Sequence, residues 1–200
     1  MEPLSLDHPR LAPDTDLSRA RQQLESYRPE TEDQSKMRDR VLDFLDEHPT
    51  DAHQRTCLEG HLTASALVFD ARCERVLLTH HRKLGRWLQL GGHCDGDANL
   101  PAVALREATE ESGLENLVVV PEIIDVDIHP IPARPREPGH LHLDSRYFVI
   151  ARGETTPRAN HESNELRWFG ISEARDVVSD ESLLRLLELE RPGSKGGFSS

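Results

Sequence analysis

The spacing of apolar residues predicts two amphipathic helices in the first quarter of the chain. Four apolar residues recur at intervals of three and four, the period of one helix face: Leu17, Ala20, Leu24 and Tyr27. A second helical period runs from about Gln34 to Glu47 and is closed by Pro49. Residues 1–14 carry three prolines and no apolar period, so we expect an arm or a frayed terminus there.

The pattern changes to that of strands in the middle of the chain. Residues 61–69 are mostly apolar and predict a buried strand, and residues 75–80 return as a second strand after a turn. Further strands are predicted at residues 87–90, 117–120, 123–128, 140–150 and 165–169. Residues 129–139 hold four prolines and predict an extended loop, and residues 152–164 predict a polar loop.

One short helix interrupts the strands and two more close the chain. Leu100-Pro101 fits a helix start, where proline is tolerated, and Gly113 fits its left-handed end. Ser172 and Ser179 are the expected caps of the two closing helices. This order of elements predicts an α+β fold around a mixed sheet.

The chain is long enough for one domain with appendages. We expect an N-terminal helical extension over residues 1–57, a main domain over residues 58–190, and a flexible tail rich in glycine and serine over residues 191–200. The two N-terminal helices could form a homodimer arm, a lid over a pocket, or simple packing on the back of the sheet.

Candidate chemistry is concentrated in residues 91–114, a glycine-containing loop followed by one short helix. Glu107, Glu110 and Glu111 lie three and four residues apart, so they share a helix face. Crowded like charges lower stability unless a cation absorbs them, and carboxylate oxygens suit Mg²⁺ or Mn²⁺. Arg106 precedes Glu110 by four residues and is expected to brace it through a charge-assisted hydrogen bond.

These residues resemble the Nudix box. The family pattern is a glycine, five residues, a glutamate, seven residues, and then Arg-Glu-apolar-any-Glu-Glu-any-Gly-apolar. Gly92 matches the first glycine and residues 106–114 match throughout, so the resembling segment spans residues 92–114. Ala98 stands where the pattern has its early glutamate, with Asp95 and Asp97 nearby but out of register. That outer carboxylate is therefore either replaced by a neighbour or dispensable.

The resemblance implies a Nudix-type α/β/α sandwich over about residues 58–190. It also implies a hydrolase that cleaves the diphosphate of a nucleoside diphosphate linked to another group. Glu107, Glu110 and Glu111 would hold Mg²⁺ or Mn²⁺, with Glu107 and Glu111 as the principal ligands. The expected catalytic residues are Glu110, Glu111 and Arg106. The general base is either Glu110 or a residue outside the box.

A row of polar residues in the predicted strand 140–150 is a second candidate feature. Strand alternation places three polar side chains on one face: His140, His142 and Asp144. Leu141 and Leu143 take the other face and are expected to enter the core. We expect the polar row to line the pocket opposite the Glu107 helix, alongside His93, and to contact phosphate or a further metal. The alternative is a strand face that is merely solvated.

Two other functions remain open from the sequence. Isopentenyl diphosphate isomerases share the Nudix fold, use histidine ligands and carry a catalytic cysteine in a Cys-x-His loop. Here Gly91 takes that cysteine position and Cys94 follows His93 instead. A catalytically silent Nudix module that binds a ligand is the third class, which Ala98 favours and the three intact glutamates oppose.

Charge and cysteine content narrow the partners. The net charge is −12, with 36 acidic and 24 basic residues, which argues against a nucleic-acid polymer but allows a small phosphorylated substrate. Arg82 lies in a basic segment that either meets a phosphate or forms a solvated turn. Three scattered cysteines predict no disulfide framework, which fits a reducing cytoplasm. No apolar run reaches transmembrane length and no signal peptide is recognisable, so we expect no membrane partner.

Overall fold

A mixed β-sheet forms the centre of the computed structural model, which describes residues 2–135, 138–153, 156–158 and 163–192. The main path of the sheet runs in the order β1 (Leu4–Ser5), β6 (Leu117–Val119), β8 (His140–Ala151), β2 (Gly60–Phe69), β3 (Arg75–His81) and β4 (Trp87–Leu88). Three strands pair off this path: β5 (Leu90–His93) with β2, β7 (Asp125–Ile131) with β8, and β9 (Ser163–Gly170) with β3. Strands β2 and β8 are parallel and the other pairs are antiparallel, as a mixed sheet requires.

The sheet forks where the Nudix-like segment begins. Strand β2 pairs with β3 only at Val68 and Phe69, and along residues 63–66 its partner is β5. Strand β3 pairs instead with β4 and β9. Because β4 and β5 are nearly continuous in the chain, Gly91 and Gly92 lie at the point where the two branches separate.

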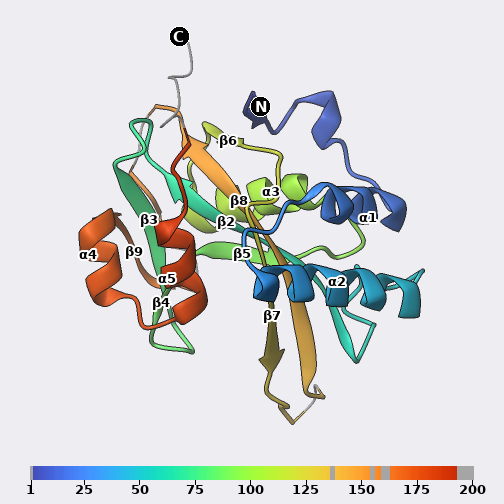
Figure 1. Cartoon of the computed structure of the whole chain (residues 1–200). Coiled ribbons are helices and arrows are strands. Elements are labelled where there is room, and N and C mark those ends of the chain that lie inside the picture. The colour runs from blue at the N-terminus through green and yellow to red at the C-terminus, as the bar shows by residue number, and fades with distance from the viewer. Residues whose placement is uncertain (1, 136–137, 154–155, 159–162, 193–200) are drawn as a thin grey trace.

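Helices cover both faces of the sheet (Figure 1). One face carries α1 (Leu17–Ser26), α2 (Glu32–Glu47) and α3 (Leu100–Ser112), whose apolar residues share the larger core with β2, β7 and β8. The other face carries α4 (Ile171–Val177) and α5 (Glu181–Glu188) over a smaller core. Every residue of β2 is buried because both of its faces are covered. The expected α/β/α sandwich is confirmed.

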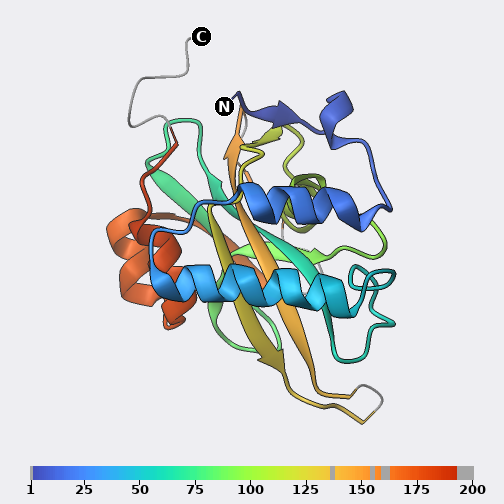
Figure 2. The same ribbon diagram turned by 45° about the vertical axis from the view of Figure 1, so that its right-hand side comes forward.

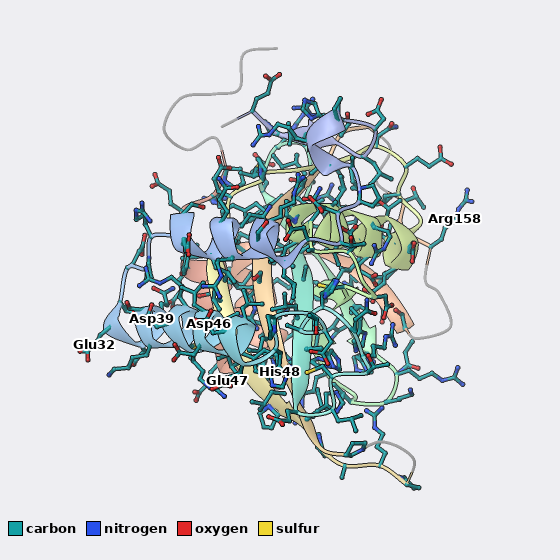
Figure 3. The ribbon with its side chains drawn as sticks, turned by 90° about the vertical axis from the view of Figure 1, so that its right-hand side faces the viewer. Glu32, Asp39, Asp46, Glu47, His48 and Arg158 are labelled. Atoms are coloured by element: carbon teal, nitrogen blue, oxygen red, sulfur yellow. The ribbon has the colours of Figure 1, made fainter. Side chains whose placement is uncertain are left out.

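The N-terminal helices are part of the sandwich. Figure 2 shows α1 and α2 side by side across β7 and β8, and Val41, Phe44 and Leu45 of α2 lie in the larger core. Of the three roles considered for these helices, the structure shows packing on the sheet. Acidic side chains are distributed along α2, as Figure 3 shows: Glu32, Asp39, Asp46 and Glu47. No helix among the described residues has the length and apolarity needed to cross a bilayer.

The first fourteen residues form the arm, and not the frayed terminus, of the two forms that we expected for them. Strand β1 pairs with β6, and Leu4 and Leu11 are buried. The Asn99 side-chain amide donates hydrogen bonds to the carbonyls of Arg10 and Ala12, at 3.1 and 2.8 Å. The arm is therefore fastened to the sheet through β1 and to the start of α3 through the Asn99 amide.

Several predicted boundaries also need correction. Strand β7 continues through Pro130 to Ile131 instead of ending before the proline-rich loop, because β7 lies beside β8 at an edge where a missing N–H is tolerated. Helix α4 is capped by Gly170 and α5 by Asp180, not by Ser172 and Ser179. The predicted tail lies outside the described residues from position 193 onward.

Restoring the family glutamate at position 98 should destabilise the protein. Ala98 is fully buried in the larger core, and its N–H donates to the carbonyl of Asp14 in the N-terminal arm. Ala98→Glu would place a carboxylate under the arm, so we expect the free energy of unfolding to fall by at least ~2 kcal/mol. Urea denaturation measures this, with the same substitution at exposed Ala133 as the control. Equal stability of the two variants would contradict the fastened arm.

Candidate functional site

The carboxylates of α3 meet the backbone of β5 at two glycines. A Cβ on Gly92 would overlap the carboxylate of Glu107, so glycine is required for this close approach. One helical turn later, Glu111 Oε2 lies 3.4 Å from the N–H of Gly91. Glu107 and Glu111 are partly buried, whereas Glu110 is exposed. The three box glutamates therefore divide into two that face β5 and one that faces solvent.

Arg106 braces Glu107 and not Glu110, which corrects our expectation. Its Nη2 donates to Glu107 Oε1 and to the carbonyl of His93, both at 3.0 Å. The bond to the β5 carbonyl places the guanidinium between strand and helix, on the Glu107 side. Arg106 therefore holds the carboxylate of Glu107 against Gly92 of β5.

The position of Glu107 suits a hard cation. Burial raises the pKa of Glu107 above its ordinary value, and the negative charges of Glu110 and Asp95 add to this, while Arg106 opposes it. A divalent ion would remove this penalty by compensating the charge. The oxygen donors of Glu107 and Glu111, which lie beside Gly92 and Gly91 of β5, fit Mg²⁺ or Mn²⁺.

Of the two aspartates near Ala98, Asp97 is the one that lies beside Arg106. Its Oδ2 lies 3.8 Å from Arg106 Nη1, and its Oδ1 accepts the N–H groups of Asp14 and Asn99. Asp95 is instead paired with Arg55 at 2.6 and 2.7 Å.

The histidines predicted to meet do come together. The rings of His93 and His142 are 4.9 Å apart, and His140 and His142 are 5.2 Å apart, measured between centroids. His61, which the sequence argument missed, lies among them with its ring 4.8–5.1 Å from the other three. An available signal was the alternation of His61, Thr63 and Ser65 with apolar residues along β2.

This histidine cluster (His61, His93, His140 and His142) lies on the opposite face of the sheet from α3. Gly92 and His93 are consecutive in β5, so their side-chain directions point to opposite faces, and Glu107 lies on the Gly92 face. Leu143 enters the larger core beneath α3, as expected, which turns His142 the other way. His140 and His142 therefore do not converge on the glutamates, and our expectation of a shared phosphate contact is wrong.

Asp144 belongs to a buried charge network and is not a ligand-facing residue as we expected. It is 1% exposed and accepts hydrogen bonds from Thr63 Oγ1, Ser65 Oγ and Arg146 Nε at 2.9, 2.7 and 3.0 Å. Arg146 also pairs with Asp125 and Asp127 of β7, at 3.2 and 3.1 Å. The carboxylate of Asp144 is therefore occupied by hydrogen bonds within the folded chain.

Burial and neighbouring charges together set the pKa values of the ionisable groups on this face. It lowers the pKa of His142 to about 2 and of His93 to about 4, with help from neighbouring imidazoles for both and from Arg55 for His93. Burial opposes ionisation of Asp127, but the hydrogen bond from His129 and the charge of Arg146 outweigh it and hold the pKa of Asp127 well below its usual value.

Two other candidate residues lie outside this arrangement. Arg82 is exposed in the turn after β3. Cys94 is 1% exposed, and burial raises the pKa of its thiol well above the ordinary value. A thiol held in its neutral form inside the core is not an activated nucleophile.

Three features together define a Nudix-type domain: the sandwich, the paired glycines of β5, and the helix α3 that carries the glutamates. The family model for the NUDIX domain matches residues 60–187, more than half of the chain, and this protein therefore belongs to the NUDIX family.

Solved structures share the fold. A C. elegans Ap4A hydrolase has 16% sequence identity and a TM-score of 0.51, over 63% of this chain and 91% of its own. The E. coli dihydroneopterin triphosphate pyrophosphohydrolase has 16% identity and a TM-score of 0.50, over 64% and 92%. A MutT NUDIX hydrolase from Burkholderia pseudomallei has 21% identity and a TM-score of 0.50, over 66% and 98%.

Removing the buried arginine should strongly destabilise the protein. Arg146→Met removes the guanidinium that pairs with buried Asp125, Asp127 and Asp144, while Arg185 still pairs with Asp125 and Asp127, so we expect a loss of about 3–5 kcal/mol in the free energy of unfolding. The control is Arg40→Met, which breaks an exposed pair with Glu47 and should cost less than ~1 kcal/mol. A cost for Arg146→Met as small as the control's would mean that the network contributes nothing to stability.

A methyl group on Gly92 should disturb metal binding. Gly92→Ala displaces the carboxylate of Glu107, so we expect Mn²⁺ affinity to fall on the order of 10- to 100-fold. Isothermal titration measures this affinity. Gly170→Ala is the matched control, because a Cβ at Gly170 meets no atom within 4 Å. Unchanged Mn²⁺ affinity in Gly92→Ala would contradict the inference that the close approach of Glu107 to Gly92 matters for metal binding.

Proposed function

We propose that this protein is a metal-dependent hydrolase that cleaves a diphosphate linkage in a nucleoside diphosphate linked to another group, or in a similar phosphorylated small molecule. The observation that carries the proposal is the placement of Glu107 and Glu111 against the two glycines of β5, with Arg106 hydrogen-bonded to Glu107. Two similar structures are an Ap4A hydrolase and a dihydroneopterin triphosphate pyrophosphohydrolase, and both names denote enzymes acting on phosphorylated small molecules.

Each box residue has a distinct part in this mechanism. Glu107 and Glu111 would hold Mg²⁺ or Mn²⁺, which when bound neutralises diphosphate charge and lowers the pKa of a coordinated water. Arg106 is a positioning residue, because it orients Glu107 and reaches the β5 backbone. Glu110 is exposed and less committed to β5, so it is the box carboxylate best placed to accept a proton from the attacking water.

The two alternative functions are less well supported. The isomerase reading needs a reactive cysteine, but Gly91 occupies the corresponding position and the Cys94 thiol is buried and neutral. A silent binding module has no need of a carboxylate held this close to the backbone of Gly92. Release of phosphate or nucleotide from a panel of diphosphate compounds, with Mg²⁺ and with chelator, separates the three classes.

Neutralising Glu111 should abolish most turnover while the fold is retained. Glu111→Gln keeps the shape of the side chain and removes a charged ligand, so we expect at least a ~100-fold loss of kcat on whichever panel compound the wild type hydrolyses. Glu115→Gln is the matched control, because Glu115 is exposed just beyond α3. Near-normal activity of Glu111→Gln with Mg²⁺ would refute the proposed hydrolase mechanism.

A further inference from the structure

We propose that His61, His140 and His142 form a second metal site, for a divalent transition metal of the zinc class, separate from the glutamate site of α3. The parallel pairing of β2 with β8 places His61 beside His142 in register. One ligand nitrogen from each of the three histidines lies within 4.8 Å of the other two. Figure 1 shows that the two strands run side by side through the centre of the molecule.

The unsatisfied nitrogen of His61 is the strongest indication of a ligand. His61 is 3% exposed, and its Nδ1 lies 3.5 Å from the carbonyl of Cys57. Its Nε2 is buried and has no hydrogen-bond partner among the described residues. A buried polar atom of this kind costs stability unless something binds it, and a metal ion is one such partner.

His140, like His61, directs its Nδ1 at a backbone carbonyl. Its Nδ1 lies 3.0 Å from the carbonyl of Pro138, which favours the tautomer with the proton on Nδ1. Its Nε2 lies 3.4 Å from Nε2 of His142. Two nitrogens bound tetrahedrally to one Zn²⁺ at about 2.0–2.1 Å would be separated by ~3.3 Å. The spacing of this pair is therefore already close to that of two ligands on one ion.

The donor set selects a different metal from the one expected at α3. Imidazole nitrogens suit Zn²⁺, Co²⁺ and Ni²⁺, whereas Mg²⁺ prefers oxygen. Three histidines would leave a fourth position on the metal. His93, whose ring is 4.9 Å from that of His142 and 5.1 Å from that of His61, would be the protein candidate for this position, and a water molecule would be the alternative.

A small cavity adjoins the cluster. Its volume is about 20 Å³, which is enough for one water, and it is lined by Arg55, Cys57, Leu58, His61, Pro138 and His140. The positive charge of Arg55 would repel a cation, but its guanidinium is engaged with the carboxylate of Asp95. The positive charge of Arg55 at the wall of the cavity is therefore offset by the carboxylate of Asp95.

The two sites can be separated by experiment because β5 lies between them. We would titrate tag-free protein, freed of metal by chelation, with Co²⁺ and record its visible absorption together with the bound metal. We expect about one equivalent of Co²⁺ with the intense absorption of a four-coordinate, nitrogen-rich site. This signal should persist in Glu107→Gln/Glu111→Gln and in the control His80→Gln, whose ring packs against Trp87.

Loss of the histidines should remove the signal. Two variants test this: the double variant His61→Gln/His142→Gln and the single variant His140→Gln. Each should bind Co²⁺ at least ~100-fold more weakly than the wild type. A loss of that size exceeds the roughly 10- to 100-fold that usually follows when a residue only supports a metal ligand through a hydrogen bond. Circular dichroism of each variant establishes that it is folded. Wild-type protein without the four-coordinate spectrum, or a folded histidine variant that keeps it, would overturn the proposal. Loss of the signal only in the glutamate variant would overturn it as well, whether or not the protein is a hydrolase.

Discussion

The buried guanidinium of Arg146 is the constraint on which one face of the sheet depends. It pairs with Asp125, Asp127 and Asp144, and so ties β7 to β8 in the interior. Arg185 of α5 pairs with two of these carboxylates, Asp125 and Asp127, and Gln34 of α2 donates to Asp125 at 3.0 Å. Because buried ions are costly unless they are fully paired, this network admits few alternative packings of its strands and of α5.

Strand β5 divides the chemistry of the molecule between its two faces. Gly92 opens one face to the carboxylate of Glu107, and His93 directs its imidazole to the other. Oxygen donors therefore gather on the side of α3, and nitrogen donors gather beside the Arg146 network. Arg106 is the physical link between them, because it contacts both Glu107 and the backbone of His93.

The departure from the family pattern at Ala98 has a structural explanation. The N-terminal arm covers this position, and Asn99 and Asp97 hydrogen-bond the arm backbone. A larger side chain at Ala98 would compete with that packing. The arm therefore packs over Ala98 and binds its backbone N–H through the carbonyl of Asp14, while Asp97 places a second carboxylate, after that of Glu107, beside Arg106 at 3.8 Å.

The sequence by itself determined those features that depend on neighbours in the chain. Helical and strand periods located the main elements, Gly113 marked the left-handed end of α3, and the box motif predicted the glutamate helix, because each of these signals is contained within a short segment. Tertiary structure decided which face each polar residue meets. The period of a strand places His142 and Asp144 on one face, but only the pairing of β8 with β2 and β7 buries Asp144 against Arg146 and brings His61 to His142. Those partners lie far apart in the chain, and strand register, which is set by packing and not by local periodicity, brings them together.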